Sequence, residues 1–333
     1  MRKILAGSVI AVAIFAIVIL TGPRPNFETV DPKIPELTYP ISDLDSLVNA
    51  WEFSTEGLKS GNEAQVVWYD SINKTNFSLV YLHGFSASHQ EGFPIHRHIA
   101  RKYGMNLYLS RLYGHGVDLE DNFGDLTPKK LLKSAKQAIG IGGIIGDSVI
   151  VMSCSTGGTY SIYLSAYNPD KIHSQILYSP NVRLFDRSAT MLTGPWGRKL
   201  AYAILGEERS ISDGKGTELE NYWTYSYNTE GIIALQALID QTMKPQVWQK
   251  VEIPTMAGYY YKSDSAMDSV ISVAAIREFL SVSSIGSDDL HDVAFPNVGD
   301  HVLASDLKSR DIESVIKETE YFIENILGLD PVQ

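Results

Sequence analysis

A cluster of nucleophilic side chains occurs where a strand-like run, Ser148–Met152, meets a helix-like run, in the turn Ser-Cys-Ser-Thr-Gly-Gly at residues 153–158. A nucleophile on a sharp strand-to-helix turn needs small residues two positions before and after it, because larger side chains collide where the backbone folds back. Ser155 has Ser and Gly at these positions, whereas Cys154 has Met and Thr. The spacing therefore predicts Ser155 as the nucleophile.

A second segment, upstream, fits the charge that attack by a serine on an acyl carbonyl creates. Leu79–Leu82 is an apolar, strand-like run that ends in His83-Gly84. A tetrahedral acyl intermediate needs two N–H donors directed at its oxygen. The residue after the nucleophile, Thr156, supplies one backbone N–H, and the loop after the earlier strand supplies the other, for which Phe85 is the candidate.

Five short motifs occur in a fixed order over residues 64–333. They are Leu82-His83-Gly84-Phe85, Tyr113-Gly114-His115-Gly116, the turn at 153–158, Asp268-Ser269-Val270 and Gly299-Asp300-His301. Because it contains these five motifs in this order, the chain resembles the α/β-hydrolase family, particularly its monoacylglycerol-lipase-like and serine-aminopeptidase-like branch. The resemblance implies an α/β fold with a mostly parallel central sheet flanked by helices. It also implies a helical cap inserted after the strand that follows the nucleophile's helix, and no cofactor.

A serine needs a neighbour that accepts its proton before it attacks. The resemblance puts this base on a loop after the last strand, where His301 follows the strand-like Val293–Phe295. His291 is the rival nearby, but it precedes that run. We therefore expect His301 to be the base.

The acid of such a triad orients the histidine and stabilises its charged form. Asp264 and Asp268 are the candidates, since both follow the strand-like Thr255–Tyr261. The family usually approaches this residue through Gly-x-x-Asp, which is absent here. Asp268 is favoured because Val270–Val273 after it matches the family's Asp-x-Val-like run.

The other histidines receive no chemical role. His115 belongs to a motif that is structural in the family. His96 and His98 lack the following Asp-His of a dinuclear hydrolase site, and no His-Glu-x-x-His helix occurs. Together with His89 they are interpreted as surface or core-edge residues, and no metal site is expected.

These residues must be positioned by alternating strands and helices, which favour a mostly parallel sheet covered on both faces. Residues 61–180 and 251–333 would form the hydrolase core, and residues 181–250 the cap. The cap is predicted from its length and its aromatic residues. These are Phe185, Trp196, Tyr202, Tyr222, Trp223, Tyr225, Tyr227 and Trp248.

Further elements are expected at the flanks of the core. Thr127-Pro128 is a good helix start, and Ile312–Leu327 keeps helical spacing up to a glycine. Residues 23–60, which begin with a proline-rich stretch, would form a tether and a leading helix capped by Ser42.

The N-terminus has a basic start followed by Ile4–Leu20, seventeen residues without a charge. As a helix, residues 4–22 would span about 28 Å, close to a hydrocarbon core of roughly 30 Å. A cleaved signal has a shorter apolar region that ends in small residues. Residues 1–22 are therefore expected to form a single-pass membrane anchor, with the body extracytoplasmic. The alternative is a cleaved signal and a secreted body.

The amino-acid composition excludes several classes of function. Of 333 residues, 44% are hydrophobic and 20% charged, and a formal charge of −11 without a basic tract argues against a nucleic-acid partner. The single cysteine excludes an internal disulfide framework and a multi-thiolate zinc site. The expected function is a serine hydrolase of acyl or lipid-like esters. A peptidase, amidase or acyltransferase with the same triad, and a non-catalytic membrane-anchored binding module, remain the alternatives.

Overall fold

The computed structural model describes residues 20–210, 214 and 216–332. Its central sheet has the order β1-β3-β2-β4-β5-β8-β10, parallel throughout except that β1 runs antiparallel to β3, and β9 pairs antiparallel with β8 at one end. The strands are β1 (Gln65–Val67), β2 (Thr75–Leu82), β3 (Asn106–Leu109), β4 (Gly146–Cys154), β5 (Ser174–Tyr178), β8 (Thr255–Ser263), β9 (Ala266–Met267) and β10 (Leu290–Phe295). The mostly parallel sheet predicted from the sequence is confirmed.

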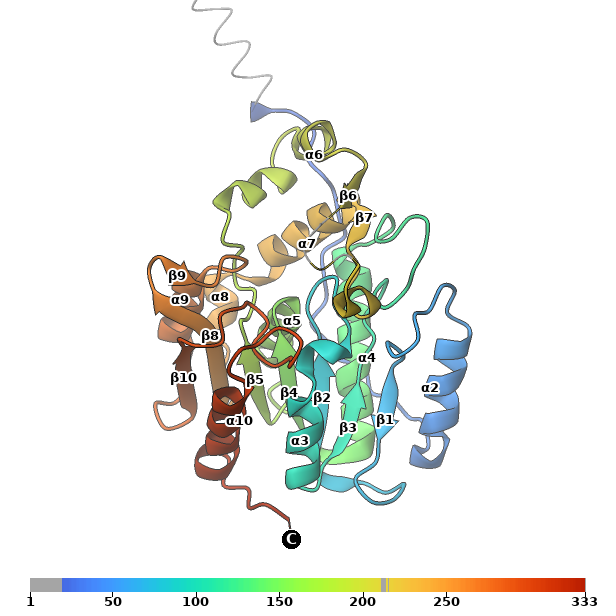
Figure 1. Ribbon diagram of the computed structural model, residues 1–333, viewed down its shortest axis with the longest axis vertical. Coiled ribbons are helices and arrows are strands. Elements are labelled where there is room, and N and C mark those ends of the chain that lie inside the picture. The colour runs from blue at the N-terminus through green and yellow to red at the C-terminus, as the bar shows by residue number, and fades with distance from the viewer. Residues whose placement is uncertain (1–19, 211–213, 215, 333) are drawn as a thin grey trace, which may run out of the picture.

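Helices cover both faces of this sheet (Figure 1). One face carries α2 (Leu44–Phe53), α4 (Pro128–Ile145), α5 (Thr156–Ser165), α8 (Pro245–Trp248) and α9 (Val273–Val282). The other carries α3 (Ile95–Lys102), α10 (Ile312–Tyr321) and the π-helical turn η5 (Phe322–Ile326). The central strands are therefore buried on both sides, which explains their nearly continuous apolar sequences.

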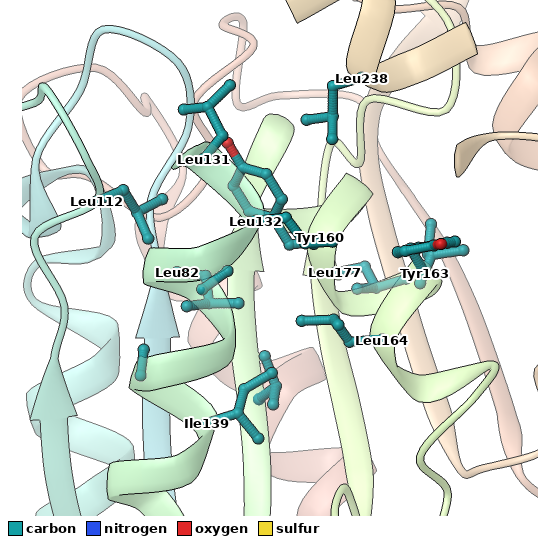
Figure 2. Close-up of a cluster of buried hydrophobic side chains, with 14 of the residues drawn as sticks. Leu82, Leu112, Leu131, Leu132, Ile139, Tyr160, Tyr163, Leu164, Leu177 and Leu238 are labelled. Carbon is teal, nitrogen blue, oxygen red and sulfur yellow. The ribbon is translucent and has the colours of Figure 1, made fainter. Parts of the chain in front are cut away.

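The central strand β4 shows how the two cores are divided. Val149 and Val151 face the core under α4 and α5, whereas Ile150, Met152 and Cys154 face the core under α3 and α10. This alternation follows from the two-residue period of a strand. Figure 2 shows the first core, where leucines of the strands meet leucines and tyrosines of α4 and α5.

A long insertion separates β5 from β8, although these strands are direct neighbours in the sheet. It contains η3 (Arg187–Thr193), α6 (Gly197–Leu205), β6 (Glu208–Ser210), η4 (Glu218–Asn221), β7 (Ser226–Asn228) and α7 (Thr229–Thr242). Figure 1 shows it above the end of the sheet, with α6 farthest away. The predicted helical cap also contains a two-stranded antiparallel sheet, formed by β6 and β7. Trp248, assigned to the cap, packs instead against Phe279 of α9.

Element boundaries follow local chemistry. Thr127 caps α4, since its side chain accepts a hydrogen bond from the Lys130 N–H. The predicted cap at Ser42 was wrong, because a 3₁₀ turn, η1 (Ile41–Asp43), precedes α2 and Asp43 directly flanks the helix. His291 lies within β10 and not before it.

The described residues 20–210, 214 and 216–332 include no helix that is both long and apolar enough to cross a bilayer. The predicted anchor at residues 1–22 lies outside the described residues except for its last three positions.

Candidate active site

Ser155 lies at a strained turn between β4 and α5. Its backbone has φ 52° and ψ −117°, a combination that a residue with a side chain rarely adopts. A Cβ added to Gly157 would lie 2.0 Å from the Leu82 carbonyl oxygen, so only glycine fits there. On the other side, Ser153 is fully buried within β4. The crowding expected around the turn is therefore present.

Backbone hydrogen bonds hold this turn in place. The Ser155 N–H donates to the Tyr178 carbonyl (3.0 Å), and the Ser155 carbonyl accepts from Asn181 N–H and Gly158 N–H (both 2.9 Å). The side chain of Cys154, the residue before Ser155, lies in the hydrophobic core under α3 and α10. The strain at Ser155 is thus maintained by its neighbours, which is typical of functional sites.

His301 forms a close pair with Asp268. The distance from His301 Nδ1 to Asp268 Oδ2 is 2.6 Å, and Asp268 Oδ1 accepts from the N–H groups of Val270 (2.8 Å) and Ile271 (3.1 Å). Asp264 lies in the exposed turn between β8 and β9, where its carboxylate accepts from Tyr261 Oη. The histidine is therefore paired with Asp268 and not with Asp264.

The pairing changes the pKa of both Asp268 and His301 in the directions that favour a charged pair. Burial alone would raise the pKa of Asp268, but the charge and hydrogen bond of His301 and the two backbone N–H groups bring it below its usual value. Burial would lower the pKa of His301, but the charge and hydrogen bond of Asp268 raise it, with smaller contributions from Glu91 and Asp300. His301 is consequently a stronger base than an ordinary histidine.

The loop after β2 is organised by His83, which is fully buried. Its Nε2 accepts from the Leu112 N–H (3.0 Å), so the ring proton is on Nδ1, which donates to the Gly84 carbonyl (2.9 Å). Burial lowers the pKa of His83 well below the usual histidine value, so the ring stays neutral and keeps this tautomer. The orientation of the Gly84–Phe85 peptide is thereby fixed.

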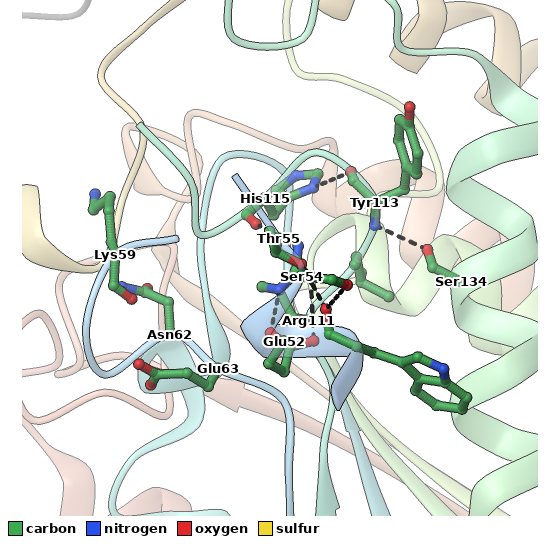
Figure 3. Close-up of polar contacts among 12 residues, drawn as sticks. Glu52, Ser54, Thr55, Lys59, Asn62, Glu63, Arg111, Tyr113, His115 and Ser134 are labelled. Carbon is green, nitrogen blue, oxygen red and sulfur yellow. Dashed lines mark hydrogen bonds and ion pairs between the residues drawn. The ribbon is translucent and has the colours of Figure 1, made fainter. Parts of the chain in front are cut away.

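A second loop, Arg111–Gly116, packs against the first one. Figure 3 shows the polar contacts that hold this second loop. Arg111 Nε donates to the Glu52 carboxylate at 2.5 Å, and His115 Nδ1 lies 2.8 Å from the Tyr113 carbonyl oxygen. The His115 ring packs edge-on against the Phe85 ring at 5.8 Å between centroids. Burial lowers the pKa of His115 to about 4. His115 is thus a neutral packing partner of Phe85.

A cavity of about 640 Å³ brings the predicted site residues together. Ser155, Thr156, Phe85, Asp268 and His301 all line it. The insertion contributes the charged side chains of Asp186 and Arg209 and an apolar wall. This wall consists of Leu184, Ala189, Leu192, Trp223, Tyr225, Tyr227, Ile232 and Leu235. Of the eight aromatic residues singled out in the sequence, only the three at positions 223, 225 and 227 belong to this wall, so most of the others serve packing or the surface.

Two buried polar residues in this cavity were missed by the sequence analysis. Glu91, 2% exposed, and Asn181, 1% exposed, lie outside every recognised motif. The one signal in the sequence for Glu91 is that a charged residue occurs nine positions after the end of the apolar strand β2. The interpretation of His89 and His96 as surface or core-edge residues was also wrong, because both are buried. No group of metal-ligating side chains occurs in the described part of the chain.

No family model and no curated protein matches the sequence. Solved structures nevertheless share its fold. One, from work on the metagenome-derived lipolytic enzymes LipS and LipT, is 14% identical with a TM-score of 0.65, covering 80% of this chain and 99% of its own. A Paleococcus ferrophilus monoacylglycerol lipase is 13% identical with a TM-score of 0.57, covering 79% and 99%. Est1E from Butyrivibrio proteoclasticus, with bound ferulic acid, is 16% identical with a TM-score of 0.53, covering 80% and 95%. The chain therefore has the α/β-hydrolase fold.

Proposed function

We propose that this protein is a serine hydrolase that cleaves carboxylic esters through an acyl-enzyme intermediate. The observation that carries the proposal is the His301–Asp268 pair, 2.6 Å apart, in the cavity that Ser155 also lines. Nucleophilic acyl transfer requires a serine and a basic histidine held by a buried aspartate, and this cavity is lined by a strained serine and by such a pair.

In the proposed reaction, His301 Nε2 takes the proton of Ser155 as its oxygen bonds to the ester carbonyl carbon. The carbonyl oxygen becomes an oxyanion, held by the backbone N–H groups of Phe85 and Thr156. Collapse of this intermediate breaks the bond to the alcohol oxygen, which receives the proton from His301. Water then attacks the carbonyl carbon of the acyl-serine, and His301 accepts its proton. The bond to the Ser155 oxygen breaks, that oxygen receives the proton from His301, and the carboxylic acid is released.

The apolar wall of the cavity favours esters with an apolar acyl group. Lipolytic enzymes and esterases among the structures of the same fold support this substrate class. An amide hydrolase or acyltransferase would use the same triad, because the wall and not the triad selects the substrate. A non-catalytic binding module would have no need of the strained turn at Ser155.

The direct test is labelling with a fluorophosphonate, which reacts with an activated serine. We expect the wild type and Ser153→Ala to be labelled and Ser155→Ala to remain unlabelled. A folded wild type without label at Ser155 would favour the binding module. Rates on p-nitrophenyl esters of several chain lengths, compared with aminoacyl anilides, would then separate an esterase from an amidase.

We also propose that residues 1–22 anchor the chain in a membrane, with the body on the extracytoplasmic side. The apolar run Ile4–Leu20 supports this, and the described chain begins at the cap, where the Trp196 N–H donates to the Pro23 carbonyl (2.7 Å). Exposed apolar side chains at Met191, Leu200 and Ile204 lie in the same part of the cap. Retention in the membrane fraction after carbonate extraction is the expected result, and release by carbonate would contradict it.

A further inference from the structure

Glu91 is a buried carboxyl group in the cavity for which the proposed reaction has no role so far. It lies in the 3₁₀ turn η2 (His89–Gly92), 2% exposed, and lines the cavity. Its Oε2 accepts hydrogen bonds from the Gly84 N–H (2.6 Å) and from Tyr81 Oη (3.4 Å). In the described part of the chain no cationic side chain forms an ion pair with it.

The carboxyl group and the nucleophile flank the same glycine. A Cβ at Gly84 would lie 2.8 Å from Glu91 Oε1 and 3.0 Å from Ser155 Cβ. A side chain is therefore excluded at position 84, and the backbone there has the conformational freedom of glycine. Something else must fix the backbone orientation if this loop is to present an N–H group to a reacting carbonyl.

Two side chains fix the backbone orientation at Gly84, one through each of its two peptide groups. His83 Nδ1 donates to the Gly84 carbonyl, which belongs to the same peptide group as the Phe85 N–H. Glu91 accepts from the Gly84 N–H, which belongs to the preceding peptide group. Because each peptide group is planar, fixing its oxygen or its N–H fixes the direction of the whole group.

We propose that Glu91 is a positioning residue, whose hydrogen bond to the Gly84 N–H fixes the loop that presents the Phe85 N–H to the oxyanion. This inference rests on the proposed function. The donor orientation matters because a small misplacement of a catalytic group costs a large factor in rate. Burial raises the pKa of Glu91 to about 7, although the Gly84 N–H and His301 oppose this. Both protonation states keep an oxygen that accepts from Gly84, so the positioning role requires an acceptor and not a charge.

The test uses the full chain with Glu91→Leu, which removes the acceptor, and Glu91→Gln, which keeps one. We expect Glu91→Leu to lower kcat about 10- to 100-fold, with KM within about twofold. Its affinity for a trifluoromethyl ketone, which forms a tetrahedral oxyanion with the serine, should fall by the same factor as kcat/KM. Affinity for the product acid should not change. Glu91→Gln should stay within about threefold of the wild type in every measurement.

Gln175→Leu is the matched control, because Gln175 is a fully buried hydrogen-bonding residue of β5 that does not line the cavity. It should lower the thermal midpoint without changing ketone affinity relative to product affinity. The inference is wrong if Glu91→Leu keeps wild-type ketone affinity. It is also wrong if Glu91→Gln, which should fold whether or not Glu91→Leu does, loses more than about tenfold in kcat.

Fluorophosphonate labelling distinguishes a failure of the proposed hydrolase function from a failure of the proposed role of Glu91. An unlabelled wild type would contradict the proposed function itself. A wild type labelled at Ser155, with Glu91→Leu folded and labelled at the same rate, would overturn only the role of Glu91.

Discussion

The end of the sheet that carries Ser155, Asp268 and His301, called the sheet end below, and the cap above it are built in different ways. Both line the same cavity. At the sheet end Asp268 is 1% exposed and Ser155 7% exposed, and backbone or charged hydrogen bonds hold both. Apart from α7, the cap consists of short elements with exposed apolar side chains, among them Met191, 56% exposed, and Ile204, 75% exposed. In the proposed reaction, the sheet end would fix the reacting geometry, whereas the cap would supply the wall that selects the substrate.

This difference follows from where each region obtains its stability. Ser155 tolerates a strained backbone because β4, α5 and the residues after β5 form a fully packed core around it. The cap has few such constraints and packs mainly through α7, whose Ala234, Leu235 and Leu238 join the core. Substitutions at the sheet end should therefore affect rate and stability, and those in the outer cap chiefly substrate choice.

The largest effect is expected from Asp268, the proposed acid of the triad. Asp268→Asn should lower kcat about 10⁴-fold, because an amide cannot stabilise the charged His301 that forms as Ser155 attacks. Asp264→Asn, the matched change in an exposed turn, should stay within about twofold. Steady-state rates on one p-nitrophenyl ester are the measurement, and comparable losses in the two variants would exclude the assignment of Asp268.

A second contrast concerns stability. Leu164→Ala removes a fully buried side chain from α5, in the core drawn in Figure 2, and should cost about 2–5 kcal/mol of unfolding free energy. Ile204→Ala removes an exposed side chain from α6 and should change it by less than about 0.5 kcal/mol. Thermal unfolding of both variants checks this. Equal shifts in the midpoint would show that the cap is as tightly packed as the core.

The same division explains what the sequence could reveal. The strands were recognisable because residues buried on both faces of a parallel sheet form short continuous apolar runs, as Ser148–Met152 does within β4. Ser155 was recognisable because the steric rule for its turn involves only neighbours in sequence. Neighbours in sequence do not decide between Asp264 and Asp268, because the pairing of Asp268 with His301 joins residues 33 positions apart.

Other features depend on contacts that leave no local pattern. The β6–β7 pair joins two three-residue strands across a loop, and each is too short to show a period. Glu91 lies in a short 3₁₀ turn and acts on Gly84, so neither a helix stripe nor a motif marks it. The burial of His96 likewise follows from tertiary packing of α3 and not from its charged neighbours in sequence.

The third prediction concerns pH. His301 must be neutral to accept a proton, and its pKa is raised above the ordinary value of 6.5, chiefly because Asp268 overcomes the effect of burial. Activity should therefore fall as the pH drops below this raised pKa, about tenfold for each further unit. His83 and His115, with lowered pKa values, stay neutral throughout this range and should add no second step. Burial raises the pKa of Glu91 to about 7, so the profile of Glu91→Gln is the control for the titration of Glu91. A kcat/KM profile with its acid limb at or below pH 6.5 would contradict the raised basicity of His301.

The smallest expected effect, a change of substrate preference, comes from the cap wall. Leu192 in η3 is partly buried and lines the cavity at a distance in sequence from every triad residue. Leu192→Trp should shorten the apolar pocket and shift the ratio of kcat/KM for long- and short-chain p-nitrophenyl esters about 10-fold toward short chains, since each methylene contributes roughly 1–3 kcal/mol to such discrimination. Met191→Trp is the control, because Met191 is the exposed neighbour of Leu192 and does not line the cavity. The short-chain rate should stay near that of the wild type in both variants, because the change leaves Ser155 and His301 in place. A loss of rate on every ester would instead mean that the cap helps to position the triad, and the distinction between the two regions would fail.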